Sequence, residues 1–157
     1  MRPEFVYITY IRTTPEQLWQ ALTVPEFTMR WWKTTLTSEW SVGSMVTWDN
    51  HGVVIAHPDQ VVLEADPFRR LAYTWHTFTE ELAKSSRFSD EIWSGLSKEP
   101  RSKVSFDLER DGDMVKLTVV HDGFAPGGTV SGMVSQGWPR LLSSLKTMLE
   151  TGSPLVS

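Results

Sequence analysis

One histidine occupies a position from which it could act chemically. His121 lies near the end of the β-rich run 114–122 and alternates with Leu117 and Val119, so these side chains share one strand face. That face is apolar, and we expect the imidazole to point into the interior. There it could hydrogen-bond a ligand carbonyl or hydroxyl, or act as a general acid or base. The alternative is a buried histidine that is satisfied by a partner near Asp122.

Two aromatic residues on another predicted strand extend this candidate site. The run 70–77 reads RLAYTWHT, and alternation places Tyr73 and Trp75 on its inward face. Tyr73 could present its hydroxyl group to a ligand, and Trp75 its ring or its indole N–H. Both residue types are also common in a core without any ligand. The same alternation predicts that Arg70 and His76 face solvent.

The motifs of established catalytic and cofactor sites are missing from the sequence. There is no G-x-S-x-G elbow at a strand-to-helix turn, no P-loop, no dinucleotide fingerprint and no H-E-x-x-H pair. The absence of cysteine excludes disulfides, thiol nucleophiles and thiolate metal ligands. His51 and His57 flank one predicted strand without a carboxylate cluster, which does not favour a metal site. The sequence therefore predicts no catalytic residue, no metal and no cofactor.

The candidate residues need a scaffold, and its clearest element is the segment 129–151. Apolar residues recur there every three or four positions, which predicts one long amphipathic α-helix. Gly152 and Pro154 follow as stop signals. Trp138 lies at the centre of this helix, where its large ring would set the depth of any cavity. We expect the half of the helix up to Trp138, including Met133 and Val134, to line the site.

Shorter elements precede that helix. A strand over 5–11 leads into two short helices that begin at Pro15 and Pro25. Strands follow, and the runs 53–56 and 60–65 are interpreted as one strand interrupted near Pro58. The polar stretch 79–102 is interpreted as an insertion with one or two short helices. The runs 103–109 and 114–122 predict a hairpin across a tight turn.

Aromatic residues are unusually frequent, with eight tryptophans among 157 residues. Aromatic walls with a few polar groups are typical of a site for a flat or apolar small molecule. The same side chains could equally pack against one another and leave no space. The residues expected to contact a ligand are Trp31, Trp48, Tyr73, Trp75, Phe106, Val119, His121, Met133, Val134 and Trp138.

The order of these elements predicts an α+β domain, with a curved antiparallel sheet wrapped around a long C-terminal helix. The length favours a single domain over residues 1–157. The chain has 15 Lys and Arg against 19 Asp and Glu, without a basic run, which argues against a nucleic-acid partner. No window approaches the roughly 20 apolar residues of a membrane span. We expect a cytoplasmic location.

Four stretches together resemble the START-like helix-grip superfamily, also called SRPBCC, and within it the homologues of the activator of heat-shock protein 90 ATPase. They are PEQLWQALTVPEFTMRWW (15–32), VVLEADPFRRLAYTW (61–75), VKLTVVHDGF (115–124) and GWPRLLSSLKTMLETG (137–152). The resemblance implies a sheet that grips the C-terminal helix, with an apolar cavity between them. It also implies binding or processing of hydrophobic small molecules. The insertion at 79–102 matches no motif of this family.

Three functions are compatible with this sequence. The first is binding of a small hydrophobic or aromatic ligand in the cavity between sheet and helix. The second is a cyclase-, aromatase- or hydrolase-type enzyme, which would need a polar pair such as His121 and Tyr73 within reach of one substrate. The third is a co-chaperone-like protein-interaction domain that uses exposed Phe88 and Trp93 and the rim near Trp31 and Trp40. The insertion that carries Phe88 and Trp93 could also form a homodimer.

Overall fold

The computed structural model describes residues 4–155 and contains eight strands and five helices in that range. The strands are β1 (Glu4–Ile11), β2 (Thr34–Thr37), β3 (Thr47–Asn50), β4 (Val53–Ile55), β5 (Val62–Asp66), β6 (Arg70–Thr74), β7 (Lys103–Asp111) and β8 (Met114–Asp122). The helices are α1 (Pro15–Thr23), α2 (Pro25–Trp32), α3 (Glu80–Ser85), α4 (Asp90–Lys98) and α5 (Thr129–Thr151). No helix in the described range is long and apolar enough to cross a membrane.

The strands form two antiparallel sheets rather than one. The larger has the order β1-β8-β7-β6-β5, and the smaller has the order β2-β3-β4. The hairpin of β7 and β8 is the centre of the larger sheet, with Val104 opposite His121 and Phe106 opposite Val119. Side chains of β8 alternate strictly between buried and half-buried, so one face of the sheet forms the core.

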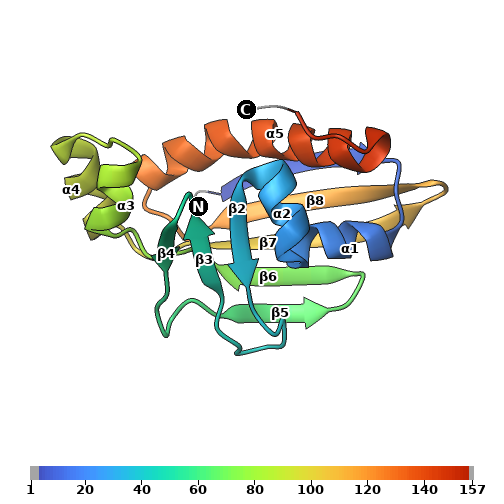
Figure 1. Ribbon diagram of the computed structural model, residues 1–157, viewed down its shortest axis with the longest axis horizontal. Coiled ribbons are helices and arrows are strands. Elements are labelled where there is room, and N and C mark those ends of the chain that lie inside the picture. Colours follow the sequence, from blue (N-terminus) through green and yellow to red (C-terminus); the bar gives the residue numbers. More distant parts are fainter. Residues whose placement is uncertain (1–3, 156–157) are drawn as a thin grey trace.

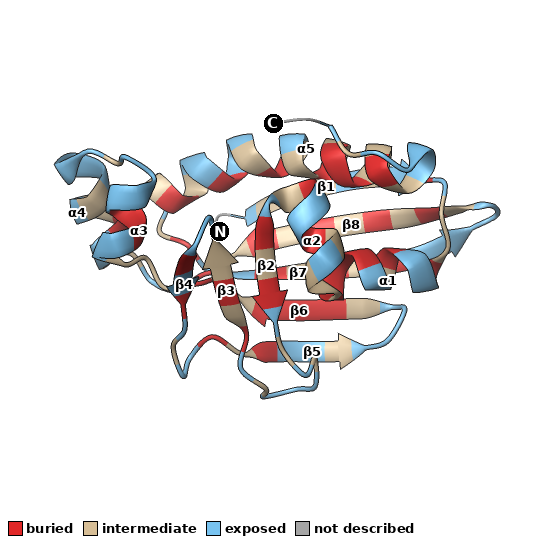
Figure 2. Cartoon of the chain, in the orientation of Figure 1, coloured by how far each residue is buried: buried red, intermediate tan, exposed pale blue. Residues whose placement is uncertain are grey.

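Helix α5 lies along the buried face of the larger sheet, with α2 beside it (Figure 1). Its buried face is a continuous stripe toward the sheet (Figure 2). The buried apolar residues of this stripe are Val130, Val134, Trp138, Leu142, Leu145 and Met148. Removal of this apolar surface from water is the main force that holds helix and sheet together. The predicted α+β architecture, with a long C-terminal helix and two short helices after the first strand, is confirmed.

Other elements hold both ends of α5. At its beginning, the carboxylate of Glu99 accepts the backbone N–H of Thr129 at 2.9 Å and that of Val130 at 3.3 Å. At its end, a guanidinium N–H of Arg30 on α2 donates to the carbonyl of Gly152 at 2.7 Å. A negative charge at the N-terminus and a positive charge at the C-terminus both complement the helix dipole. The helix has no side-chain cap of its own, because Gly128 occupies its N-cap position.

The structure corrects the sequence interpretation of one segment and agrees with that of another. The run 53–65 was predicted as one interrupted strand, but β4 and β5 belong to different sheets, so that prediction is wrong. The chain leaves the small sheet through the turn at Pro58, and Gln60, which is fully buried, then bonds backbone groups instead of continuing a ladder. The segment 79–102 contains α3 and α4, as expected for an insertion with short helices, and both lie near the beginning of α5 (Figure 1).

The Glu99 cap generates a prediction about two glycines of α5. A Cβ at Gly128 would lie 2.1 Å from Oε1 of Glu99, whereas a Cβ at Gly132 would meet no atom within 4 Å. Gly132→Ala should therefore raise the free energy of unfolding by about 0.5–1 kcal/mol, as for an open helical site. Gly128→Ala displaces the cap and should leave the protein about 1 kcal/mol or more below the Gly132→Ala variant.

Urea unfolding of the two variants and the parent chain measures these differences. Equal stability gains in both alanine variants would contradict the role assigned to the Glu99 cap. When Glu99→Gln is added to both variants, the difference between their free energies of unfolding should become smaller. The reason is that the carboxylate charge, which the helix N-terminus stabilises, is then gone.

Candidate functional site

A buried chain of hydrogen bonds links α5 to the sheet at His121. The indole Nε1–H of Trp138 donates to Nδ1 of His121 at 3.0 Å. On the other side of the imidazole, Nε2 lies 2.8 Å from Oγ of Ser102, just before β7. His121 is 0% exposed, Trp138 1% and Ser102 2%. All three side chains are thus largely buried, and hydrogen bonds join them in one chain.

The direction of these bonds follows from the indole, which can only donate. Because Nδ1 of His121 must accept from Trp138, the proton of the neutral imidazole lies on Nε2 and is donated to Ser102. Burial is the main cause that lowers the pKa of His121 to about 3; Asp122 opposes this shift, and Lys103 and His76 add to it. The imidazole is therefore neutral near pH 7, and it cannot accept a proton at Nδ1 while the Trp138 bond exists.

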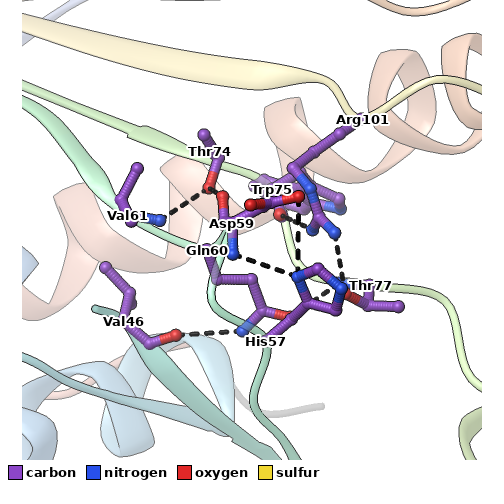
Figure 3. Close-up of polar contacts among 9 residues, drawn as sticks. All are labelled: Val46, His57, Asp59, Gln60, Val61, Thr74, Trp75, Thr77 and Arg101. Carbon is purple, nitrogen blue, oxygen red and sulfur yellow. Dashed lines mark hydrogen bonds and ion pairs between the residues drawn. The ribbon is translucent and has the colours of Figure 1, made fainter. Parts of the chain in front are cut away.

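The chain after β6 is held from two sides (Figure 3). The side-chain oxygen of Gln60 accepts the N–H of Thr77 at 2.9 Å, and its amide nitrogen donates to the carbonyls of Val46 and Ile55. From the other side, the guanidinium of Arg101 donates to the carbonyl of Trp75 and to Oγ1 of Thr77, each at 3.0 Å. The segment 75–77 is thus fixed between the small sheet and the β7 entry.

This double attachment determines the position of His76, which the sequence placed on the solvent face. That prediction is wrong, since His76 is only 8% exposed. Strand β6 ends at Thr74, so alternation no longer applies two residues later. The ring packs against Trp48 at 4.8 Å and Phe78 at 4.8 Å between centroids. Arg70, the other residue predicted to face solvent, does lie on the outer sheet face, where it forms ion pairs with Glu64 and Asp107.

Burial also determines the protonation of His76. It lowers the pKa of His76 to about 4, with a smaller contribution from the nearby positive charge of Arg101, although the bond to the carbonyl of Thr77 acts in the opposite direction. Since that carbonyl only accepts, Nδ1 carries the proton at a distance of 2.8 Å. Nε2 keeps its lone pair, and no hydrogen-bond partner for it occurs within residues 4–155.

A cleft of about 130 Å³ opens between this segment and the first half of α5. Its walls are almost entirely apolar, with His76 as the polar member. The lining residues are Trp75, His76, Phe78, Val130, Met133, Val134, Gly137, Trp138 and Leu141. The cleft therefore lies where the glycine-bearing half of α5 faces the end of the sheet.

The residues predicted to contact a ligand divide into two groups. Trp75, Met133, Val134 and Trp138 line this cleft. The others form the packed interior behind it, namely Trp31, Trp48, Tyr73, Phe106, Val119 and His121. Ring contacts join the groups, for example Trp75 to His121 at 4.7 Å and Phe106 to Trp138 at 5.8 Å between centroids. The interior residues do not line the cleft themselves but pack behind the rings that do.

The other lining residues were not named individually among the expected ligand contacts. Val130 and Gly137 fall in the half of α5 that the sequence predicts to line the site, and Leu141 follows the helical spacing beyond it. Gly137 carries no side chain, so its place at the cleft has no signal in a hydrophobic pattern. His76 and Phe78 lie beyond the end of β6, and only the bonds of Gln60 and Arg101 bring them to the cleft.

Neither a metal centre nor a hollow on the outer face of the large sheet offers a competing site. Within residues 4–155 no group of three or more histidines and carboxylates could hold a metal ion. A hollow of about 360 Å³ lies on the outer face of the large sheet. Charged side chains there already pair with each other, as Lys103 with Asp122 and Arg70 with Asp107. Paired charges leave little for a ligand to gain.

Sequence comparison assigns the chain to a family. The family described as Activator of Hsp90 ATPase homolog 1-like protein matches residues 12–150. The chain belongs to this family. None of the curated proteins matches it in sequence.

Solved structures similar to this chain have the same fold. A protein from Mesorhizobium loti is 25% identical with a TM-score of 0.71, over 94% of this chain and 96% of that one. An Aha1 protein from Colwellia psychrerythraea, described as a dimer, is 21% identical with a TM-score of 0.69, over 96% of this chain and 98% of that one. CalU16 from Micromonospora echinospora is 20% identical with a TM-score of 0.68, over 97% of this chain and 76% of that one. The helix-grip architecture is thereby confirmed.

The two buried histidines predict a loss of stability on acidification. The unfolded chain takes up their protons near pH 6.5, whereas the folded protein does so only near the lowered pKa values, about 4 for His76 and about 3 for His121. Below pH 6.5 the unfolded state therefore binds more protons than the folded state. As a result, the free energy of unfolding decreases as the pH is lowered. At about pH 5 the loss should be roughly 2 kcal/mol for each histidine.

Urea unfolding at about pH 7.5 and about pH 5 measures this difference. His121→Asn keeps an acceptor for Trp138 but removes the titrating ring, so its stability should depend less on pH over this interval. His51→Gln, at an exposed turn position, should keep the dependence of the parent chain. The same pH dependence in all three proteins would contradict the buried, neutral state of His121.

Proposed function

We propose that this protein binds a small hydrophobic or aromatic molecule in the cleft between the segment 75–78 and α5. The observation that carries the proposal is the apolar cleft of about 130 Å³ with aromatic walls from Trp75, Phe78 and Trp138. Concave, apolar, aromatic surfaces with few polar groups are typical of small-molecule sites. The volume suits a group about as large as one or two fused rings.

The interior behind the cleft is better suited to support a ligand than to contact it. Trp32 packs against Trp48 and Trp138, each at 5.5 Å between centroids, and Trp48 packs against Trp75 at 4.9 Å. Rings at these distances fill the space between sheet and helix. The accessible volume therefore lies at the α5 side, and the interior rings fix the wall against which a ligand would stack.

The contacts of His121 and Tyr73 favour binding over catalysis by this pair. Tyr73 is 1% exposed, and burial raises the pKa of its hydroxyl far above its usual range. His121 commits both ring nitrogens to Trp138 and Ser102. Neither residue lines the cleft, so neither can exchange a proton with a molecule bound there. His76, with a free Nε2, is the polar group that a ligand in the cleft would meet.

The expected homodimer and the cytoplasmic location stay predictions. A surface for self-association is available on α4, where Ile92 is 39% exposed and Trp93 is half-buried. The similar protein from Colwellia psychrerythraea is described as a dimer, which supports a dimeric state for this chain. Binding at the cleft does not depend on it.

A substitution at Gly137 tests the binding site. Gly137 lines the cleft, and an added Cβ would meet no atom within 4 Å, so Gly137→Leu should fill the cleft without disturbing the fold. A screen of lipids and of aromatic compounds such as indole should yield ligands that raise the melting temperature of the parent chain, because a ligand of the native state stabilises it. Gly137→Leu should abolish this rise.

Gly132→Leu is the matched control, since it adds the same side chain to an exposed position on the same helix. It should keep the full ligand effect. A screen in which no compound stabilises the parent chain, or a rise that survives in Gly137→Leu, would overturn the proposed site.

A further inference from the structure

A second cleft adjoins the apolar one. It has a volume of about 210 Å³ and lies between the segment 76–78 and the chain that connects α4 to β7. Its lining residues are His76, Thr77, Phe78, Leu96, Ser97, Glu99, Pro100, Arg101 and Ser102. His76 and Phe78 belong to both clefts. The two therefore share a wall, and the second is polar where the first is apolar.

Arg101 brings an unpaired positive charge to this polar cleft. The ion pairs within residues 4–155 do not include it, and its side chain is half-buried. Of the five N–H groups of a guanidinium, one bonds the carbonyl of Trp75 and one bonds Oγ1 of Thr77. Both of these partners are neutral. The remaining donors and the full charge are available to an anion.

Two of the hydroxyl groups that line the polar cleft, those of Ser102 and Thr77, are also oriented as donors. Oγ of Ser102 accepts the proton on Nε2 of His121, and Oγ1 of Thr77 accepts from Arg101. Each hydroxyl keeps its own proton, and residues 4–155 offer no acceptor for either one. When a hydroxyl group accepts a hydrogen bond, its O–H becomes more polarised, and the hydrogen bond that the same hydroxyl donates becomes stronger. Arg101, Ser102 and Thr77 thus line the same cleft and each has a donor without a partner among residues 4–155.

The carboxylate of Glu99, which also lines this cleft, already accepts hydrogen bonds from the backbone. Both carboxylate oxygens of Glu99 lie within 3.4 Å of backbone N–H groups at the start of α5. The partial positive charge of the helix N-terminus stabilises this carboxylate. Glu99 is therefore engaged away from Arg101, and the polar cleft combines an unpaired cation with free donors. Carboxylates favour such a set of donors.

We propose that the two clefts together bind one amphipathic carboxylate, with its aromatic or alkyl part in the apolar cleft and its carboxylate on Arg101. This inference rests on the proposed function, because the apolar cleft must accept the rest of the ligand. It adds the chemical class of that ligand and the residue that selects it. Ser102, held by His121 and Trp138, donates to the same carboxylate.

Indole-3-acetate, indole-3-propionate and indole-3-butyrate are suitable probes, each compared with its neutral amide by titration calorimetry. The indole ring is common to all, and the chain lengths allow for the span between the clefts. At least one acid should bind the parent chain about tenfold or more tightly than its amide, because hydrogen bonds to a charged group are stronger than neutral ones. Added salt should reduce this preference.

Variants at Arg101 distinguish recognition of the carboxylate from support of the fold. Arg101→Gln should abolish the preference for the acid, so that acid and amide bind with equal affinity. Any loss of affinity common to both reports the support that Arg101 gives to the segment 75–77. Arg101→Lys keeps the charge and should retain part of the preference. Arg140→Gln removes the same charge from an exposed position on α5 and should bind like the parent chain. If Arg101→Gln fails to fold, the ratio of acid affinity to amide affinity in the parent chain and in Arg101→Lys still tests whether Arg101 recognises the carboxylate.

The outcomes separate the two proposals. Amide binding without a preference for the acid would overturn the carboxylate site and leave the apolar site intact. An equal loss of acid and amide affinity in both Arg101 variants would show that Arg101 only supports the segment 75–77. If neither acid nor amide binds at any chain length, the apolar cleft does not hold a ring of this size, and both proposals fail.

Discussion

The buried hydrogen bond from Trp138 to His121 connects the long helix to the centre of the large sheet. An indole cannot accept, so this bond fixes the imidazole in one neutral tautomer and directs its proton to Ser102. Loss of one partner would leave a buried polar group unsatisfied, which costs about 1–3 kcal/mol. The position of α5, the protonation of the histidine and the orientation of a hydroxyl thus depend on one contact.

The cleft itself depends on the segment that follows β6. Gln60 attaches it to the small sheet, and Arg101 attaches it to the strand that begins at Lys103. Between these attachments the chain has left the sheet ladder, yet its backbone groups remain bonded. His76 and Phe78 are consequently held against α5 without belonging to a regular element. A rigid wall of this kind lets a small cleft keep its shape without a ligand.

Local pattern was sufficient for the elements and for part of the site. Helical spacing identified α5, and alternation correctly oriented Tyr73 and His121 toward the interior. Alternation failed at His76 because its position depends on Gln60 and Arg101, which are distant in sequence. The sequence did not predict that the strands divide between two sheets, for a similar reason. Which strands pair depends on contacts between residues that are distant in sequence. The volume of the cleft also arises from packing, so no residue pattern could reveal it.

The contact of Glu99 with the first turn of α5 ties two parts of the chain that are distant in sequence. The segment 79–102, which contains α3 and α4, supplies the side-chain cap that α5 itself lacks. The carboxylate of Glu99 needs the space left by the missing side chain of Gly128. Residues 99 and 128 therefore constrain each other, and the segment 79–102 could not be exchanged in this chain without regard to the beginning of α5.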